Sequence, residues 1–421
     1  MVVEKPEKYR AGGYYPALVG DTLKERYQIV HKLGHGSYST IWLARDTKKE
    51  AYVALKINTA DFKSDQAKIQ TFLSDSCYLE NPGWSMIPIL QDHFKMESPN
   101  GVHECYATSP ALISVANSME MPVESAFSIE VARSLVAQLI HAVAYIHSRG
   151  IVHGGNILID NATSLDSLSI PELYRHYGEP VSESLERYDE GPLTPGVPTH
   201  ITEPIWLGKE ARKFTVPEAR LLLSDFGEAF SFRNQKGPKL GKDCKSPRYC
   251  LPPEAYFEPD KPLSFTTDTW TLACAIWNIV TGYQLFSSFF PDSDEITAQH
   301  IEILGALPAE WLVNWKAKDK YFDEDVRSKR KRKILPLREL FFERMEKTKE
   351  TRKNYSAVEM NKGESTALLD MLESMLTYRP GLRASMSTVL NSDWMVYWGS
   401  PSYEVRHQKV DSWLPLSTAV S

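Results

Sequence analysis

The sequence has few cysteines, and their pattern excludes two classes of site. Its five cysteines are odd in number and include no C-x-x-C pair; they are Cys77, Cys105, Cys244, Cys250 and Cys274. A disulfide framework needs paired cysteines, and structural zinc sites use closely spaced ones. We therefore expect reduced thiols and a protein of the cytoplasm or the nucleus.

The chain also lacks a long apolar run, a secretion signal and a strong excess of charge. Its most apolar stretch, residues 270–280, is too short to span a bilayer. The N-terminus M-V-V-E-K-P-E-K-Y-R carries charges where a signal peptide has an apolar core. The formal net charge of −6 argues against nucleic acid as the main partner, because phosphate binding needs a basic surface. We expect a soluble monomer with no membrane and no direct nucleic-acid contact.

Hydrophobic patterning begins with a small β-rich part. Residues 1–26 form an irregular lead-in that is rich in glycine, tyrosine and proline. Three strand patterns joined by tight turns follow within residues 27–57, and they predict an antiparallel sheet. Residues 62–75 weakly favour one helix. We assign residues 27–109 to this part.

Helical patterns prevail from residue 110 to residue 395, and a tail, 396–421, follows. Ser128 can cap a helix whose apolar residues recur at three- and four-residue steps, and further helices are expected at about 266–282 and 365–377. Residues 162–218 are polar and rich in proline, so they predict a surface insertion. A brief buried strand over 221–223 comes next. The whole pattern predicts an α+β fold.

Three motifs carry chemistry when they are taken together. L-G-H-G-S-Y-S-T-I, residues 33–41, places two glycines in a strand–turn–strand setting that lets backbone approach a phosphate. V-A-L-K places Lys56 within an apolar strand, where an anion would offset its burial. S-D-F-G places Asp225 after an apolar run, where its carboxylate can hold a divalent ion. A hairpin turn, an edge-strand lysine and a plain turn are the alternatives for each motif alone.

A fourth motif, H-x-x-N at residues 153–156, lies between the second motif and the third. The order of the four motifs resembles the signature set of protein kinases. The resemblance implies a bilobal fold with a small antiparallel β-rich N-lobe that has one helix, and a larger α-helical C-lobe. Residues 246–254 resemble the end of an activation segment, so Glu254 is expected to pair with Arg383. ATP and Mg²⁺ are the implied cofactors. The implied ATP-binding residues are Leu33, Gly34, Gly36, Ser37, Ile41, Ala54 and Lys56.

The lead-in and the first strands resemble the SR-protein kinases (SRPK), particularly their fungal relatives. A segment at about 305–360 resembles the insertion of the wider CMGC kinase group. The family transfers the ATP γ-phosphate to serines of Arg-Ser-rich proteins, notably splicing factors. Carried onto this chain, the catalytic residues are Lys56, Asn156 and Asp225, and Asn156 and Asp225 are also the metal ligands.

The catalytic loop departs from the family. Relatives typically read H-G-D-L-H-P-G-N, whereas this chain reads His153-Gly154-Gly155-Asn156, so about four residues are absent. The catalytic Asp is among them, and Gly155 stands at the position, counted from His153, that this Asp occupies in relatives. With the loop shortened, we expect the carboxylate of Asp268 to be buried and poorly paired. The helix position that usually offers glutamate to Lys56 is aligned with Gln66.

Two interpretations remain open. The chain is either an active SRPK-like enzyme whose printed sequence has lost loop residues, or a pseudokinase that binds partners. Two other segments are also ambiguous. R-S-K-R-K-R-K, residues 327–333, is a nuclear-import signal or a solvated face. Asp323, Glu324 and Asp325 are part of a dock for arginine-rich substrates or an ordinary charged loop.

Overall fold

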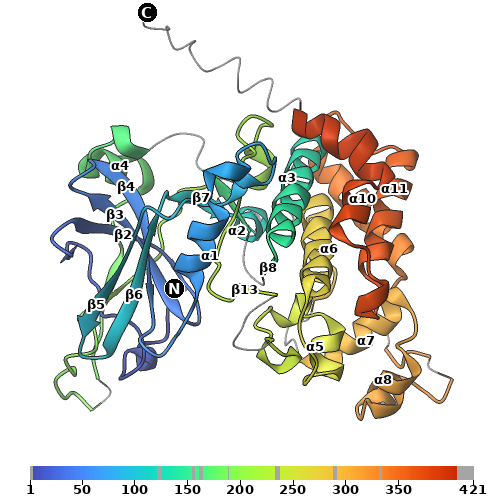
Figure 1. Cartoon of the computed structure of the whole chain (residues 1–421), viewed down its shortest axis with the longest axis horizontal. Coiled ribbons are helices and arrows are strands. Elements are labelled where there is room, and N and C mark those ends of the chain that lie inside the picture. Colours follow the sequence, from blue (N-terminus) through green and yellow to red (C-terminus); the bar gives the residue numbers. More distant parts are fainter. Residues whose placement is uncertain are drawn as a thin grey trace, which may run out of the picture. The chain divides into compact units, whose positions relative to one another are not determined.

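The computed structural model describes residues 3–120, 126–153, 157–160, 165–187, 189–232, 238–287, 292–325, 327–330 and 334–404 (Figure 1). Packing divides the chain into two compact units. Unit 1 comprises Met1–Tyr78, Ile87–Ser114 and Leu158–Lys209, and unit 2 comprises Leu79–Met86, Val115–Ile157 and Glu210–Ser421. The predicted α+β class is confirmed, because antiparallel strands dominate unit 1 and helices dominate unit 2.

Unit 1 is built on a six-stranded antiparallel sheet with the order β1-β2-β3-β4-β6-β5. Its strands are β1 (Thr22–Leu23), β2 (Tyr27–His35), β3 (Ser39–Asp46), β4 (Ala51–Asn58), β5 (Asp92–Ser98) and β6 (Gly101–Thr108). Strands β2 to β4 are the three predicted ones. Strands β5 and β6 were not predicted, although Phe94 and Met96 alternate on β5 before a turn and so carry a strand signal.

Shorter elements complete unit 1. They are α1 (Gln66–Leu73), α4 (Ile170–Tyr177), β7 (Ala111–Ser114), which pairs antiparallel with β9 (Ile157–Asp160), and the antiparallel pair β10 (Ser182–Ser184) and β11 (His200–Thr202). The helix expected at 62–75 is therefore present as α1, in a shorter form.

The two faces of the large sheet are covered by different segments. On one face, Trp42, Leu55 and Ile57 belong to a core that also includes Ala17 of the lead-in. On the other face, the side chains of β2, β3 and β4 meet apolar residues of the predicted insertion. This second cluster consists of Val30, Leu43, Tyr52, Leu165, Leu173 and Leu207.

Main-chain contacts also tie the predicted insertion to unit 1. Asp166 Oδ1 accepts from the backbone N–H of Tyr52 at 2.6 Å, and the Tyr174 hydroxyl donates to the carbonyl of Val30 at 2.9 Å. Helix α4 begins with a capping box between Ser169 and Glu172. Residues up to Lys209 thus pack with unit 1, whereas the sequence-based boundaries assigned the whole insertion to the C-terminal part.

Unit 2 consists mainly of helices. They are α2 (Val115–Glu120), α3 (Ile129–Ser148), α5 (Pro253–Phe257), α6 (Phe265–Thr281), α7 (Ser293–Leu304), α8 (Ala309–Asn314), α9 (Lys318–Tyr321), α10 (Leu337–Arg352), α11 (Lys362–Met375) and α12 (Met386–Leu390). The strands are β8 (Ile151–Val152), which pairs antiparallel with β13 (Phe230–Ser231), and β12 (Leu221–Leu223).

Helices α3 and α6 pack together in the core of unit 2 (Figure 1). Helix α3 begins as predicted, because the Ser128 hydroxyl accepts from the Val131 N–H at 3.3 Å. It is long and apolar enough to cross a membrane, but 78% of the relevant window is buried inside the protein, as in a core helix. Helix α6 buries Trp270 and Trp277 and ends at Gly282, whose φ of 77° favours glycine.

Candidate active site

The predicted ATP-binding residues of unit 1 lie on neighbouring strands. Gly34 on β2 is opposite Ile41 on β3, and Ile41 is opposite Lys56 on β4. Ala54 lies two residues before Lys56, so both side chains point to the same face of the sheet. These residues are half-buried. The strand register thus gathers them into one patch, with Leu33 beside it and half-buried against the cluster formed with the insertion.

Lys56 has the partner that the alignment of the following helix predicts. Its Nζ donates to Gln66 Oε1 at 3.1 Å. Gln66 is buried at the start of α1, and its Nε2 donates to Gln70 Oε1 at 3.0 Å. A neutral amide can orient the lysine, but it does not neutralise the ammonium group as a carboxylate would.

Gly36 and Ser37 lie in the exposed turn between β2 and β3. Sequence reasoning missed the side chains that hold this turn from the lead-in. The Tyr14 hydroxyl donates to the carbonyl of Gly36 at 2.6 Å, and Lys8 Nζ donates to the carbonyl of Ser37 at 3.3 Å. The lead-in has no periodic pattern, so nothing local in the sequence signals these contacts.

Asp225 follows β12 in unit 2 and is exposed. Its φ of 63° places it in the left-handed region, which aspartate tolerates better than most residues and which occurs often at functional sites. The next residue, Phe226, is fully buried and packs edge-on against the His153 ring, with centroids 4.7 Å apart. The buried phenylalanine therefore fixes the segment while the carboxylate stays accessible.

An exposed carboxylate is a suitable ligand for Mg²⁺, which usually takes one or two carboxylates together with phosphate oxygens and water. Asp225 fits that role. The second predicted ligand, Asn156, lies outside the described residues, as do Gly154 and Gly155. Within the described ranges, no three His, Cys, Asp or Glu side chains cluster as a metal site.

The expectation that Asp268 is poorly paired is wrong. Asp268 is buried on α6, and its Oδ2 accepts from the backbone N–H of His153 at 2.8 Å. The same oxygen lies 2.9 Å from His147 Nε2. Both partners precede Gly154, so neither contact depends on the loop residues that follow. The carboxylate holds the end of α3 and the start of the catalytic loop together.

His153 is buried and serves as a packing residue. Burial lowers its pKa, against the opposing effects of the charges of Asp268 and Asp225 and of a hydrogen bond to the backbone of Ser224. The ring therefore stays neutral at pH 7 and contacts Phe226. This arrangement ties the catalytic loop to the segment that carries Asp225.

The predicted pair of Glu254 and Arg383 is confirmed. The two guanidinium Nη atoms donate to the two carboxylate oxygens at 2.6 and 2.5 Å, and both side chains are buried. Arg383 also donates to the carbonyls of Thr266, Thr377 and Tyr378. The end of the activation segment is thus fixed to the start of α6.

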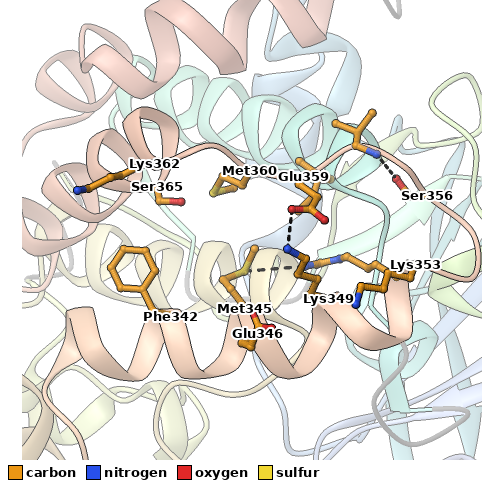
Figure 2. A pocket seen from close by; sticks show the side chains of 13 residues that line it. Phe342, Met345, Glu346, Lys349, Lys353, Ser356, Glu359, Met360, Lys362 and Ser365 are labelled. Carbon is orange, nitrogen blue, oxygen red and sulfur yellow. Dashed lines mark hydrogen bonds and ion pairs between the residues drawn. The ribbon is translucent and has the colours of Figure 1, made fainter.

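A pocket of about 310 Å³ lies elsewhere in unit 2, between α10 and the segment that leads into α11 (Figure 2). Phe342, Met345 and Met360 give it an apolar lining, and Figure 2 shows the ion pair of Lys349 and Glu359, 2.9 Å long, at the pocket. It contains none of the predicted site residues, so it is separate from the candidate active site.

Comparison with known proteins agrees with this geometry. The profile of the protein kinase domain matches residues 27–168 and 213–395, which is more than half of the chain. The chain is 26% identical to a serine/threonine protein kinase of Aspergillus fumigatus over 77% of each chain. It is 25% identical to the serine/threonine-protein kinase SRPK of Physarum polycephalum, over 93% of this chain and 91% of that one. It is 32% identical to SRSF protein kinase 3 of Mus musculus, over 35% of this chain and 26% of that one. The chain therefore belongs to the protein kinase family, as an SRPK-like serine/threonine kinase.

Proposed function

We propose that the protein binds ATP with Mg²⁺ and transfers the γ-phosphate to serines of Arg-Ser-rich proteins, with slow turnover in the sequence as it stands. The observation that carries this proposal is the position of Lys56. It lies in register with the glycine-rich strands and is oriented by α1. Asp225 is the accessible carboxylate that would hold Mg²⁺, which neutralises phosphate charge when it is bound.

We expect slow turnover because the loop lacks the aspartate that relatives carry. During transfer, the serine oxygen forms a bond to phosphorus, the bond to the ADP oxygen breaks, and the serine proton must leave. A general base typically contributes about 10²- to 10⁴-fold to such a step. Lys56 still supplies charge stabilisation for the phosphates, which is the larger part of phosphoryl-transfer catalysis. ATP binding should therefore survive better than turnover.

Arg-Ser-rich substrates follow from the likeness to SRPK and from charge. The chain has a formal net charge of −6, which favours basic partners. Asp323, Glu324 and Asp325 remain a candidate dock for arginines. Asp325 forms an exposed ion pair with Arg327 at 3.2 Å, and an incoming arginine would have to compete with it.

A second candidate function is that of a pseudokinase, which recruits partners and retains ATP binding without turnover. The observation that favours it is Gln66. It occupies the position from which kinases of this type offer a glutamate, and its neutral amide orients Lys56 without carrying a charge of its own. Loss of the base and loss of this glutamate would both lower catalysis.

The cytoplasm or the nucleus remains our proposal for localisation. Within the basic stretch 327–333, the Arg330 guanidinium pairs with Glu295 at 2.8 Å and with Glu302 at 3.0 Å. Those contacts support a structural role for Arg330. Residues 331–333 lie outside the described residues.

The test uses the purified full chain, Mg-ATP and an Arg-Ser peptide. A matched variant carries Asp-Leu-His-Pro inserted between Gly154 and Gly155, which restores the loop of the relatives. Its control carries Asn-Leu-His-Pro at the same place. We expect ATP binding in all three proteins, and phosphorylation about 10²-fold or more faster with the Asp insertion than with the Asn insertion.

Three results would change the proposal. Robust phosphorylation by the unaltered chain would show that the short loop supports efficient catalysis. Equal, negligible rates with both insertions would favour the pseudokinase. Failure of the unaltered chain to bind ATP would exclude the proposed use of Lys56 and Asp225.

A further inference from the structure

The lead-in is anchored in unit 1 by a buried ionic cluster. Glu4 is buried, and its carboxylate accepts from the Tyr9 hydroxyl at 2.5 Å and forms an ion pair with Lys32 Nζ on β2. Lys32 is fully buried and also faces the Trp42 ring, with its Nζ 5.4 Å from the centroid. Burial of the phenol raises the pKa of Tyr9, so this side chain remains a neutral donor to Glu4.

Between this anchor and the sheet, the lead-in folds back on itself at Gly12 and Gly13. Gly12 has a φ of 80°, and a Cβ added at Gly13 would lie 1.8 Å from the carbonyl oxygen of Lys8. The backbone of this turn then pairs with the residues that follow β4. The N–H of Ala60 donates to the Gly13 carbonyl at 3.0 Å, and that of Asp61 donates to the Gly12 carbonyl at 2.9 Å. The fold-back needs glycine, and it fixes the lead-in beside the glycine-rich turn.

Three consecutive carbonyls of that turn are held. The Gly36 carbonyl accepts from the Tyr14 hydroxyl at 2.6 Å, and the Ser37 carbonyl accepts from Lys8 Nζ at 3.3 Å. The Tyr38 carbonyl accepts from the backbone N–H of Thr59 at 2.8 Å. Tyr14 is buried beneath an exposed turn, so its hydroxyl is a fixed donor.

Holding the carbonyls also orients the amides. A trans peptide is planar, and its C=O and N–H groups point in opposite directions. The hydrogen bond to the Gly36 carbonyl therefore directs the N–H of Ser37 away from Tyr14. In the part of the chain that the structure describes, the N–H groups of Ser37 and Tyr38 have no protein acceptor. Successive free backbone N–H groups are the usual means by which glycine-rich turns bind phosphate.

We propose that the lead-in positions the glycine-rich turn for the phosphates of ATP, with Tyr14 as the positioning residue. This inference rests on the proposed binding of ATP beside Lys56. Tyr14 acts through the Gly36–Ser37 peptide and not on the nucleotide itself. Loss of its hydroxyl frees that peptide to rotate, so the phosphates must order it on binding.

The test compares nucleotides that differ only in their phosphates. Calorimetric titration of the full chain with Mg-ATP and with adenosine would be carried out for the wild type, Tyr14→Phe and Tyr15→Phe. We expect Tyr14→Phe to weaken ATP about 3- to 10-fold, which is the scale of one hydrogen bond, and to leave adenosine unchanged. Tyr15→Phe is the matched control, because the neighbouring Tyr15 ring packs edge-on against His103 of β6. It should bind both ligands as the wild type does.

A second variant, Lys8→Met, removes the donor to the Ser37 carbonyl from a half-buried position and should weaken ATP about 2-fold, again without affecting adenosine. The inference would be overturned if Tyr14→Phe and Lys8→Met both bound ATP as tightly as the wild type does. An equal loss of ATP and adenosine affinity would also overturn it, because the effect would then be general. A wild-type chain that does not bind ATP contradicts the proposed function itself, whereas a wild-type chain that binds ATP no better than the two variants do contradicts only the inference.

Discussion

The guanidinium of Arg383 is buried, and each of its nitrogen atoms donates a hydrogen bond. It pairs with both oxygens of Glu254 and donates to three backbone carbonyls. Removing one partner of such a pair leaves a buried charge uncompensated, which typically costs about 3–5 kcal/mol. An exposed pair is worth about 0–1 kcal/mol, because water screens it.

We therefore predict that Arg383→Ala lowers the free energy of unfolding by about 3–5 kcal/mol, measured by urea denaturation at pH 7. Arg338→Ala is the control. Arg338 also pairs with a carboxylate, that of Glu373, but both side chains are 43% exposed. We expect it to cost about 1 kcal/mol or less. Equal losses from the two variants would mean that burial of Arg383 does not set the strength of its pair.

Single residues differ in how far the sequence reveals their contacts. The partnership of Glu254 and Arg383 could be predicted because each lies in a recognisable motif. The pairing of Asp268 could not, because it depends on which backbone and side-chain groups the fold places near α6. The contact of Tyr14 with Gly36 joins an irregular segment to a turn, and neither element has a period that indicates a partner.

At the level of elements, the predicted insertion behaves as part of the sheet that it covers. Leu173 on α4 is fully buried among Val30, Leu43 and Tyr52, which come from three strands of unit 1. Its side chain therefore replaces water on an apolar face of the sheet. Burial of this kind is worth several kcal/mol for one leucine when the cavity left by its removal cannot collapse.

We predict that Leu173→Ala lowers the unfolding free energy of unit 1 by about 2–5 kcal/mol. Hydrogen exchange read by mass spectrometry would localise the loss to β2, β3 and β4. Val181→Ala is the control in the same insertion, because Val181 is 56% exposed and should change stability by about 0.5 kcal/mol or less. Unchanged protection of the three strands in Leu173→Ala would contradict an integral role for the insertion.

Periodicity explains which elements could be predicted. Helices α3, α6 and α11 and strands β2 to β4 carry regular apolar spacing, and each was expected near its observed place. The attachment of the insertion was not expected. Its contacting leucines, Leu165, Leu173 and Leu207, are far apart in a polar, proline-rich segment, and only the folded chain brings them to one cluster.

At the scale of the whole molecule, buried and half-buried histidines make stability depend on pH. Burial lowers the pKa of five of them, which are His31, His103, His141, His153 and His300. Below the ordinary histidine pKa of about 6.5, the unfolded chain takes up protons that the folded chain cannot accept. The free energy of unfolding must therefore fall as the pH drops through 6.5, and the loss continues down to the folded pKa of each group.

His300 is the clearest case. Burial, with a smaller contribution from the charge of Arg383, lowers its pKa to about 3. Its ring packs against Phe286 and Trp270, and neither ring nitrogen has a hydrogen-bond partner among the described residues. Phenylalanine would keep these aromatic contacts without a group that titrates. At pH 5, the penalty for keeping His300 neutral is about 2 kcal/mol relative to pH 7.

We predict that His300→Phe is at least as stable as the wild type at pH 7 and loses about 2 kcal/mol less between pH 7 and pH 5. Urea denaturation at both pH values measures the difference. His176→Phe is the control, because the His176 side chain is exposed on α4 and its replacement should leave the pH dependence as it is. A loss in His300→Phe as large as that of the wild type would show that the other buried histidines, or the carboxylates, set the acid sensitivity.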